Sequence, residues 1–182
     1  MSVAADLFYN QGYRATGVNE VIEKSGVAKA TFYHHFPAKY DLGLAYLKYT
    51  RKDELAYLDN YLASRTRPLD RFLAIMESLG PWMVDTDFRG CAFINMASEV
   101  PDPGSPMRKE GTMLYDAIRE RVKTLSEELI ASDRVKYGHL DVRELTNDFM
   151  VIFVGAVALS ELYHDIWPAE HALSSVRRLV GA

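Results

Sequence analysis

The sequence predicts an all-α protein, built as an N-terminal three-helix helix-turn-helix head joined to a larger helical body. Apolar residues recur at helical spacing along most of the 182 residues, and this period is the main indicator of amphipathic helices. No Asn-Gly or Asp-Gly dipeptide marks a β-hairpin. Proline and glycine punctuate the periodic segments, so we expect helices separated by short turns.

Three short helices are expected first and are followed by one long helix. The first ends at about Gln11, and Pro37 ends the third, because proline cannot continue a helix. Gly80-Pro81, the Pro101 to Pro106 loop, Gly138 and Pro168 are expected to separate the helices of the body. The predicted helices after the first span about 18–24, 29–36, 39–64, 68–84, 88–99, 105–131, 141–165 and 168–180.

Two domains are expected, a head at residues 1–45 and a body at residues 46–182. No repeat or low-complexity linker lies between them. The head should therefore run directly into the body through the long helix at about 39–64.

The composition is that of an ordinary globular protein, with 48% hydrophobic and 25% charged residues. A single cysteine excludes an intramolecular disulfide and favours a reducing compartment. The longest apolar run, Phe149 to Leu159, is too short to span a bilayer. No basic segment followed by an apolar core marks a signal peptide. We expect a cytoplasmic protein without a membrane partner.

The charge is unevenly distributed along the chain. The net charge is −4 at pH 7, yet the first fifty residues carry more basic than acidic side chains. Between Lys24 and Tyr40 there are three lysines, two histidines and no acid. A positive window on an acidic body is what a head facing phosphate needs.

The first helix of the predicted helix-turn-helix lies between residues 18 and 24. Thr16 or Gly17 can cap it, and Glu20 stands three residues after Gly17, as in a capping box. Its apolar residues share one face at helical spacing and are Val18, Val21 and Ile22.

The turn and the second helix follow directly. Gly26 can adopt the left-handed conformation that a tight turn requires, and Val27 is expected to fill the angle between the two helices. Phe32 and Phe36 should anchor the second helix inward. A helix of exposed donors and aromatic side chains suits the DNA major groove. The side chains left to face outward are Lys29, Thr31, Tyr33, His34 and His35.

This pattern resembles the heads of the TetR/AcrR family of bacterial repressors over about 45 contiguous residues. The resemblance implies a homodimer that binds a palindromic double-stranded DNA operator and a small-molecule inducer, with no cofactor, no metal and no enzymatic activity. The matching segments are Ala4-Ala5-Asp6-Leu7-Phe8, Gly12-Tyr13, Ser25-Gly26-Val27 and Thr31-Phe32-Tyr33-His34-His35-Phe36-Pro37-Ala38-Lys39.

The resemblance also implies roles for single residues of the head. Lys29 and Thr31 should approach bases or phosphates, and Lys39 should hold a phosphate at the start of the long helix. Tyr33 and His34 should contact the phosphate backbone or base edges, as donors that set register do. His35 is the remaining candidate for a DNA contact. Tyr33 and His35 each have an alternative role, which is only to pack the head.

The head departs from the family pattern in two places. Ala28 stands where serine or threonine usually caps the third helix, which should cost about 1 kcal/mol of local stability. Family members also carry about ten more residues before Ala4, commonly with basic residues that touch DNA. We therefore expect either an earlier native start or weaker DNA binding.

The body is expected to form the dimer and to bind the inducer. The resemblance implies that the helices at about 145–163 and 169–180 form a four-helix interface with a twofold mate, and the alternative is that they are plain core. The candidates for lining a mostly apolar cavity, each also a candidate for plain core, are Trp82, Phe93, Met96, Tyr115, Phe149 and Tyr163. Asn95 and Glu99 are the candidate polar anchors.

The segment from Gly90 to Val100 is similar to a stretch in a subset of the family that includes repressors of electrophile and oxidant detoxification, in some of which the cysteine is the sensor. Arg89 could stabilise a thiolate at Cys91. The other interpretation is that Cys91 is a buried small apolar residue, as lone cysteines usually are.

The sequence thus predicts a ligand-responsive transcriptional repressor, and two other classes remain as alternatives. One is a helical interaction module without DNA binding. The other is an enzyme, for which the sequence offers Glu161-x-x-His164 and the scattered His139 and His171. A di-iron bundle needs a second such pair, and none is present.

Overall fold

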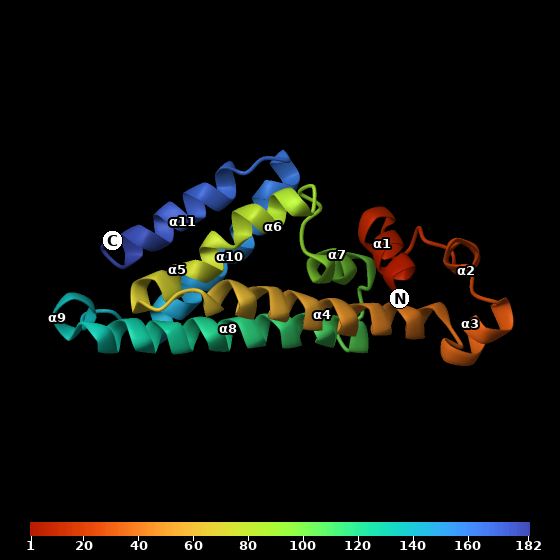
Figure 1. Cartoon of the computed structure of the whole chain (residues 1–182), viewed down its shortest axis with the longest axis horizontal. Coiled ribbons are helices and arrows are strands. Elements are labelled where there is room, and N and C mark those ends of the chain that lie inside the picture. Colours follow the sequence, from red (N-terminus) through yellow and green to blue (C-terminus); the bar gives the residue numbers. More distant parts are fainter. The chain divides into compact units, whose positions relative to one another are not determined.

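The structure is a computed structural model that describes residues 1–182, and it contains eleven helices and no strand (Figure 1). The all-helical prediction is confirmed. The helices are α1 (Ser2–Gln11), α2 (Val18–Ser25), α3 (Lys29–His35), α4 (Lys39–Ala63), α5 (Pro68–Glu77), α6 (Leu79–Asp85), α7 (Ala92–Glu99), α8 (Pro106–Ser132), α9 (Arg134–Tyr137), α10 (Val142–Tyr163) and α11 (Trp167–Leu179).

Two predicted helices have different bounds in the structure, and one helix was not predicted. The expected single helix at about 68–84 is two helices that break at Ser78, and Pro81 lies in the first turn of α6, where its missing N–H needs no partner. Helix α7 begins only at Ala92, because Asp87 and Phe88 adopt φ of 49° and 53°, outside the right-handed helical region. The short helix α9 was not predicted.

The chain divides into two compact units, and the division falls within α4 and α8. The N-terminal unit comprises Met1–Glu54 and Cys91–Leu114, so it joins the predicted head to α7 and the start of α8. The C-terminal unit comprises Leu55–Gly90 and Tyr115–Ala182.

Apolar side chains of the first three helices form the core of the head. The buried residues include Leu7 and Phe8 of α1, Val21 of α2 and Phe32 of α3. The ring of Phe8 lies 5.3 Å from that of Tyr13 and 5.5 Å from that of Tyr46 on α4, in tilted aromatic contacts. These contacts fix the start of α4 against α1.

The turn between α2 and α3 has the predicted backbone conformation, but the side chain expected to pack between the two helices does not do so. Gly26 has φ 66° and ψ 11°, which is the left-handed cap expected there. Val27 is 41% exposed, so the expectation that it fills the angle between the helices was wrong. The buried hydroxyl of Thr16 does not cap α2. It donates to the carbonyls of Leu7 and Gly12 and ties α1 to the turn.

In the C-terminal unit, α11 packs along α10 and against α5 and α6, with α10 and α11 side by side (Figure 1). Phe72 of α5 and Phe149 of α10 are fully buried, and their rings meet edge to face at 5.4 Å. Val176 and Ala172 bury the inner face of α11. Aromatic and branched side chains thus join three helices into one core.

Helix α10 is longer than the apolar run that identified it. The helix has 22 residues and a mean hydropathy of 1.5, and it is long and apolar enough to cross a membrane. The argument that the apolar run from Phe149 to Leu159 is too short to span a bilayer therefore does not apply to the whole helix. The core helix of a soluble protein meets the same criteria. In the C-terminal unit α10 packs against α11 and α6 and is partly buried.

Replacing Gly26 with alanine should lower the free energy of unfolding by about 1 kcal/mol, because left-handed backbone is unfavourable for residues with a Cβ. No atom lies within 4 Å of an added Cβ, so the loss of stability comes from the backbone conformation and not from a steric clash. Urea unfolding followed by circular dichroism measures it. Gly26→Asn is the control and should lose less, since asparagine tolerates this conformation; equal losses would contradict the argument.

Candidate DNA-binding surface and effector-binding body

Helix α3 presents one buried and one exposed face. Phe32 is only 5% exposed and holds the helix against the head. Ala28 precedes α3 and makes no side-chain cap, as its sequence predicts. Helix α3 contains no acid. The side chains that reach solvent are Lys29, Thr31, Tyr33, His34 and His35.

The aromatic side chains of α3 support one another. The ring of Tyr33 meets that of Phe32 edge to face at 5.4 Å, while 41% of Tyr33 remains exposed. Phe36 lies 5.8 Å from Phe32 and is half-buried. The Tyr33 ring is therefore both packed against Phe32 and accessible to solvent.

Lys39 lies at the first residue of α4 and is bound within the head. Its Nζ donates to the carbonyl of Arg14 at 3.2 Å and lies 4.7 Å from the centre of the Tyr13 ring. Burial lowers the pKa of Lys39, and the charge of Glu99 opposes that shift. A contact of Lys39 with phosphate would therefore compete with these internal contacts.

Glu99, predicted as a polar anchor for the inducer, has another role. Its carboxylate accepts hydrogen bonds from the backbone N–H of Tyr13, at 2.9 Å, and of Arg14. These bonds tether the last residue of α7 to the turn after α1, within the N-terminal unit. Its assignment to an effector cavity stays a prediction. Sequence reasoning missed the tether because 86 residues separate the partners.

The other predicted effector residues fall into both units. Cys91, Phe93 and Met96 are buried and Asn95 is half-buried in the N-terminal unit. In the C-terminal unit Phe149 is fully buried, and Trp82 and Tyr115 are half-buried.

Tyr163 lies on the surface of the protomer rather than in a cavity. It is 60% exposed and packs against Trp167, with the ring centres 5.5 Å apart. Its place among cavity-lining residues stays a prediction. It belongs to the exposed apolar residues of α10 and α11, which also include Val151, Leu159, Leu162 and Trp167.

Arg89 is paired with a carboxylate in the C-terminal unit. Its guanidinium donates to Glu161 at 3.2 Å, and an added Cβ on Gly90, which has φ 77°, would collide with the same carboxylate. Glu161 therefore holds the loop before α7 rather than serving a di-iron site. Cys91 is buried, and its sensing role stays a prediction.

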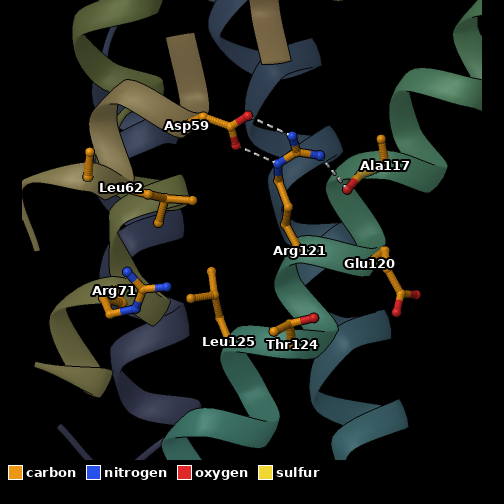
Figure 2. A pocket seen from close by; sticks show the side chains of 9 residues that line it. Asp59, Leu62, Arg71, Ala117, Glu120, Arg121, Thr124 and Leu125 are labelled. Atoms are coloured by element: carbon orange, nitrogen blue, oxygen red, sulfur yellow. Dashed lines mark hydrogen bonds and ion pairs between the residues drawn. The ribbon is translucent and has the colours of Figure 1, made fainter. Parts of the chain in front are cut away.

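A groove of about 610 Å³ opens between α4, α5 and α8 in the C-terminal unit, a place that the sequence did not indicate (Figure 2). Leu62 and Leu125 line it, and Arg121 closes one side by donating to both carboxylate oxygens of Asp59 at 2.8 and 2.9 Å. Arg71, at the opposite side, pairs with Glu128 at 3.0 Å. Its charged groups are thus paired within the protein.

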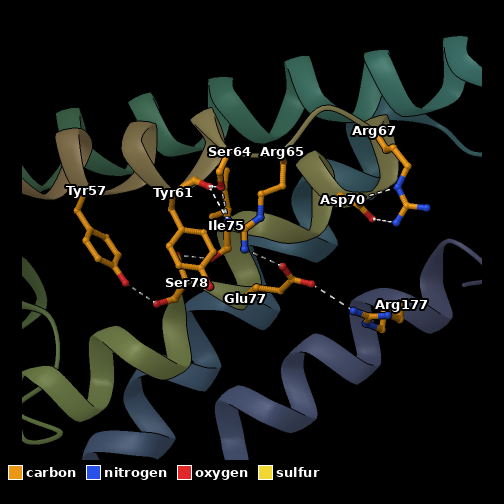
Figure 3. A network of polar contacts seen from close by, with 10 residues as sticks. All are labelled: Tyr57, Tyr61, Ser64, Arg65, Arg67, Asp70, Ile75, Glu77, Ser78 and Arg177. Atoms are coloured by element: carbon orange, nitrogen blue, oxygen red, sulfur yellow. Dashed lines mark hydrogen bonds and ion pairs between the residues drawn. The ribbon is translucent and has the colours of Figure 1, made fainter.

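A polar network joins α4, α5 and α11 in the same unit (Figure 3). Glu77 contacts Arg65 at 3.6 Å and Arg177 at 3.2 Å. The hydroxyl of Tyr57 donates to the carbonyl of Ser78, at the break between α5 and α6. The network stabilises this helix junction and leaves no charge unpaired.

An acid-free helix of exposed donors, held over a buried phenylalanine after a left-handed glycine turn, defines a helix-turn-helix DNA-binding protein. Residues 1–46 match the family described as "Bacterial regulatory proteins, tetR family", and residues 68–176 match "Tetracyclin repressor-like, C-terminal domain". The chain therefore belongs to the TetR family of transcriptional regulators, which are cytoplasmic, bind DNA operators as dimers and are not enzymes.

Known relatives and structures agree with this assignment. The chain is 28% identical to the transcriptional regulator AcuR of Cereibacter sphaeroides, across 84% of this chain and 70% of AcuR. It is 23% identical to the transcriptional repressor NemR of Escherichia coli, across 99% of this chain and 91% of NemR. A TetR-family regulator from Streptomyces coelicolor superposes with a TM-score of 0.85 at 25% identity, covering 98% of this chain and 90% of the other.

Replacing Glu99 with glutamine should loosen the tether, because an amide offers one acceptor oxygen where the carboxylate offers two. The Tyr13 and Arg14 amides should exchange hydrogen faster, with a loss of about 1–2 kcal/mol, since hydrogen bonds to charged groups exceed neutral ones. Amide exchange by nuclear magnetic resonance measures this. Glu120→Gln, at an exposed carboxylate on α8, is the control. Unchanged protection at both amides would rule the tether out.

Proposed function

We propose that the protein is a ligand-responsive repressor, released from its operator when a small molecule binds the body. In this proposal residues 1–45 are the DNA-binding domain and residues 46–182 the ligand-binding and dimerisation domain. The observation that carries it is the exposed face of α3 above the buried Phe32. Membership of the TetR family supports it.

The reading surface in this proposal is the exposed face of α3. Lys29 and Thr31 lie at the N-terminal end of α3, the end of a recognition helix that meets base edges. Tyr33, His34 and His35 then contact phosphates and set the register. Lys39 joins them when a phosphate replaces the Arg14 carbonyl at its ammonium group.

The operator should be palindromic, because a twofold dimer presents two copies of α3 to successive half-sites. Half-sites read this way lie about 34–36 Å apart. An effector that binds better to a different spacing of the two heads depopulates the DNA-bound state. The effector contacts that we propose are Trp82, Cys91, Phe93, Asn95, Met96, Tyr115 and Phe149.

Selection from a random DNA pool tests operator binding. We expect a palindromic product whose affinity falls steeply with salt, as phosphate contacts require. Lys29→Ala should weaken binding and reduce the slope of log affinity against log salt by about 1. Fluorescence anisotropy with the selected DNA measures both.

The matched control is Lys136→Ala, which removes the same charge from the exposed surface of α9. It should leave the salt slope unchanged. Failure to enrich any DNA would overturn the proposal and favour a helical interaction module.

The exposed apolar side chains of α10 and α11 support a dimer interface. Leu162 is 76% exposed in the protomer, and Val151 and Leu159 of the same helix are also exposed. Leu162→Glu should shift the protein from dimer to monomer, because the interface would bury an unpaired charge. Analytical ultracentrifugation measures the mass. Val135→Glu, at an exposed valine of α9, should leave the dimer intact; a dimeric Leu162→Glu would place the interface elsewhere.

A further inference from the structure

Ala30 lies on the outermost side of α3, although the sequence did not single it out. Phe32 marks the direction in which α3 is buried, since it is only 5% exposed. Two residues correspond to about 200° of rotation around an α-helix. Ala30 and His34, two residues before and two residues after Phe32, therefore lie nearly opposite the buried face, and both are exposed. Because four residues separate them, they lie one above the other on the outward side of the helix.

The position of Ala30 along α3 is at the end that approaches the bases. A recognition helix contacts base edges with its N-terminal residues, and Ala30 is the second residue of α3. Val27, in the turn just before α3, is 41% exposed. An apolar side chain that stays in contact with water contributes little to the stability of the head. The base-facing end of α3 thus presents apolar groups to its surroundings.

The side chains of α3 limit the bases that this helix can recognise. In the major groove, arginine and lysine pair with guanine, asparagine and glutamine with adenine, acidic side chains with cytosine, and apolar groups contact the C5-methyl group of thymine. Helix α3 contains no arginine, asparagine, glutamine, aspartate or glutamate. At its base-facing end, Lys29 remains for guanine, and the methyl groups of Ala30 and Thr31 remain for thymine.

We propose that Ala30 determines operator specificity by contacting the C5-methyl group of one thymine in each half-site, an inference that rests on the DNA-binding function proposed above. A methyl side chain neither donates nor accepts a hydrogen bond, so the thymine methyl group is the base feature of the major groove that it complements. The small size of alanine also lets the backbone of α3 come close to the base edges. Val27 extends the apolar surface at the same end.

The packing of the head keeps Ala30 in this outward position. Phe32 is buried, and its ring lies 5.8 Å from that of Phe36. A rotation of α3 that turned another side chain outward would expose Phe32 to water, which is unfavourable. His34, one turn after Ala30 on the same side, lies towards the C-terminal end of α3 and contacts phosphate in the function proposed above.

Replacement of thymine by uracil tests the contact, because uracil lacks only the C5-methyl group and still pairs with adenine. The operator is first selected from random DNA with the full-length protein. Each thymine of a half-site, on both strands, is then replaced in turn by uracil, and fluorescence anisotropy measures the affinity of each duplex. We expect one thymine per half-site to be sensitive, with a loss of about fourfold, which corresponds to the burial of one methyl-sized group.

Variants at position 30 assign the effect to this side chain. Ala30→Gly removes the methyl group of the protein and should bind the thymine and uracil operators equally. A loss of helix stability affects both operators alike and cancels in the ratio of their affinities. Ala30→Ser should also reduce this ratio, because its hydroxyl group would face the thymine methyl group. Ala38→Gly, at an exposed alanine of the same head outside α3, is the matched control and should keep the wild-type ratio.

The outcomes separate this inference from the repressor function. An enriched operator in which no thymine is sensitive to uracil overturns the inference and leaves DNA binding standing. A sensitive thymine whose affinity ratio is unchanged in Ala30→Gly also overturns it, and loss of the ratio only in Val27→Ala would assign the contact to Val27 instead. Failure to enrich any DNA overturns the repressor function together with this inference.

Discussion

The tether between Glu99 and the backbone of Tyr13 and Arg14 is the interaction on which the arrangement of the head depends. It joins the end of α7 to the turn after α1, and it makes α7 part of the same compact unit as the head. Because a carboxylate accepts strong hydrogen bonds from backbone N–H groups, a turn that would otherwise be an exposed loop is fixed. Any displacement of α7 must therefore move or break this turn.

The exposed face of α3 is likewise held in place by buried contacts. Phe32 buries one side of α3, and the Tyr33 ring packs on it. The exposed donors of α3 are thus carried by a helix that cannot rotate without exposing Phe32. Lys39 is held against Tyr13 by the same turn that Glu99 tethers. The base of α4 and the end of α7 therefore meet at one short segment.

Some carboxylates of the body are paired with arginine side chains and others are not. Arg51, Arg121 and Arg89 each satisfy a carboxylate. Glu54 receives none, although Arg51 lies on the same helix.

The sequence by itself determined the features that depend on local spacing. These are the helices, the left-handed Gly26, the inward Phe32 and the outward face of α3, because periodicity and backbone preference act within a few residues. Contacts between distant segments were decided only by the tertiary structure. Glu99 finds its partners 86 residues away, and Val27 and Tyr163 have apolar side chains whose exposure no local pattern reveals. Packing, which depends on the whole chain, decides which side chain meets which.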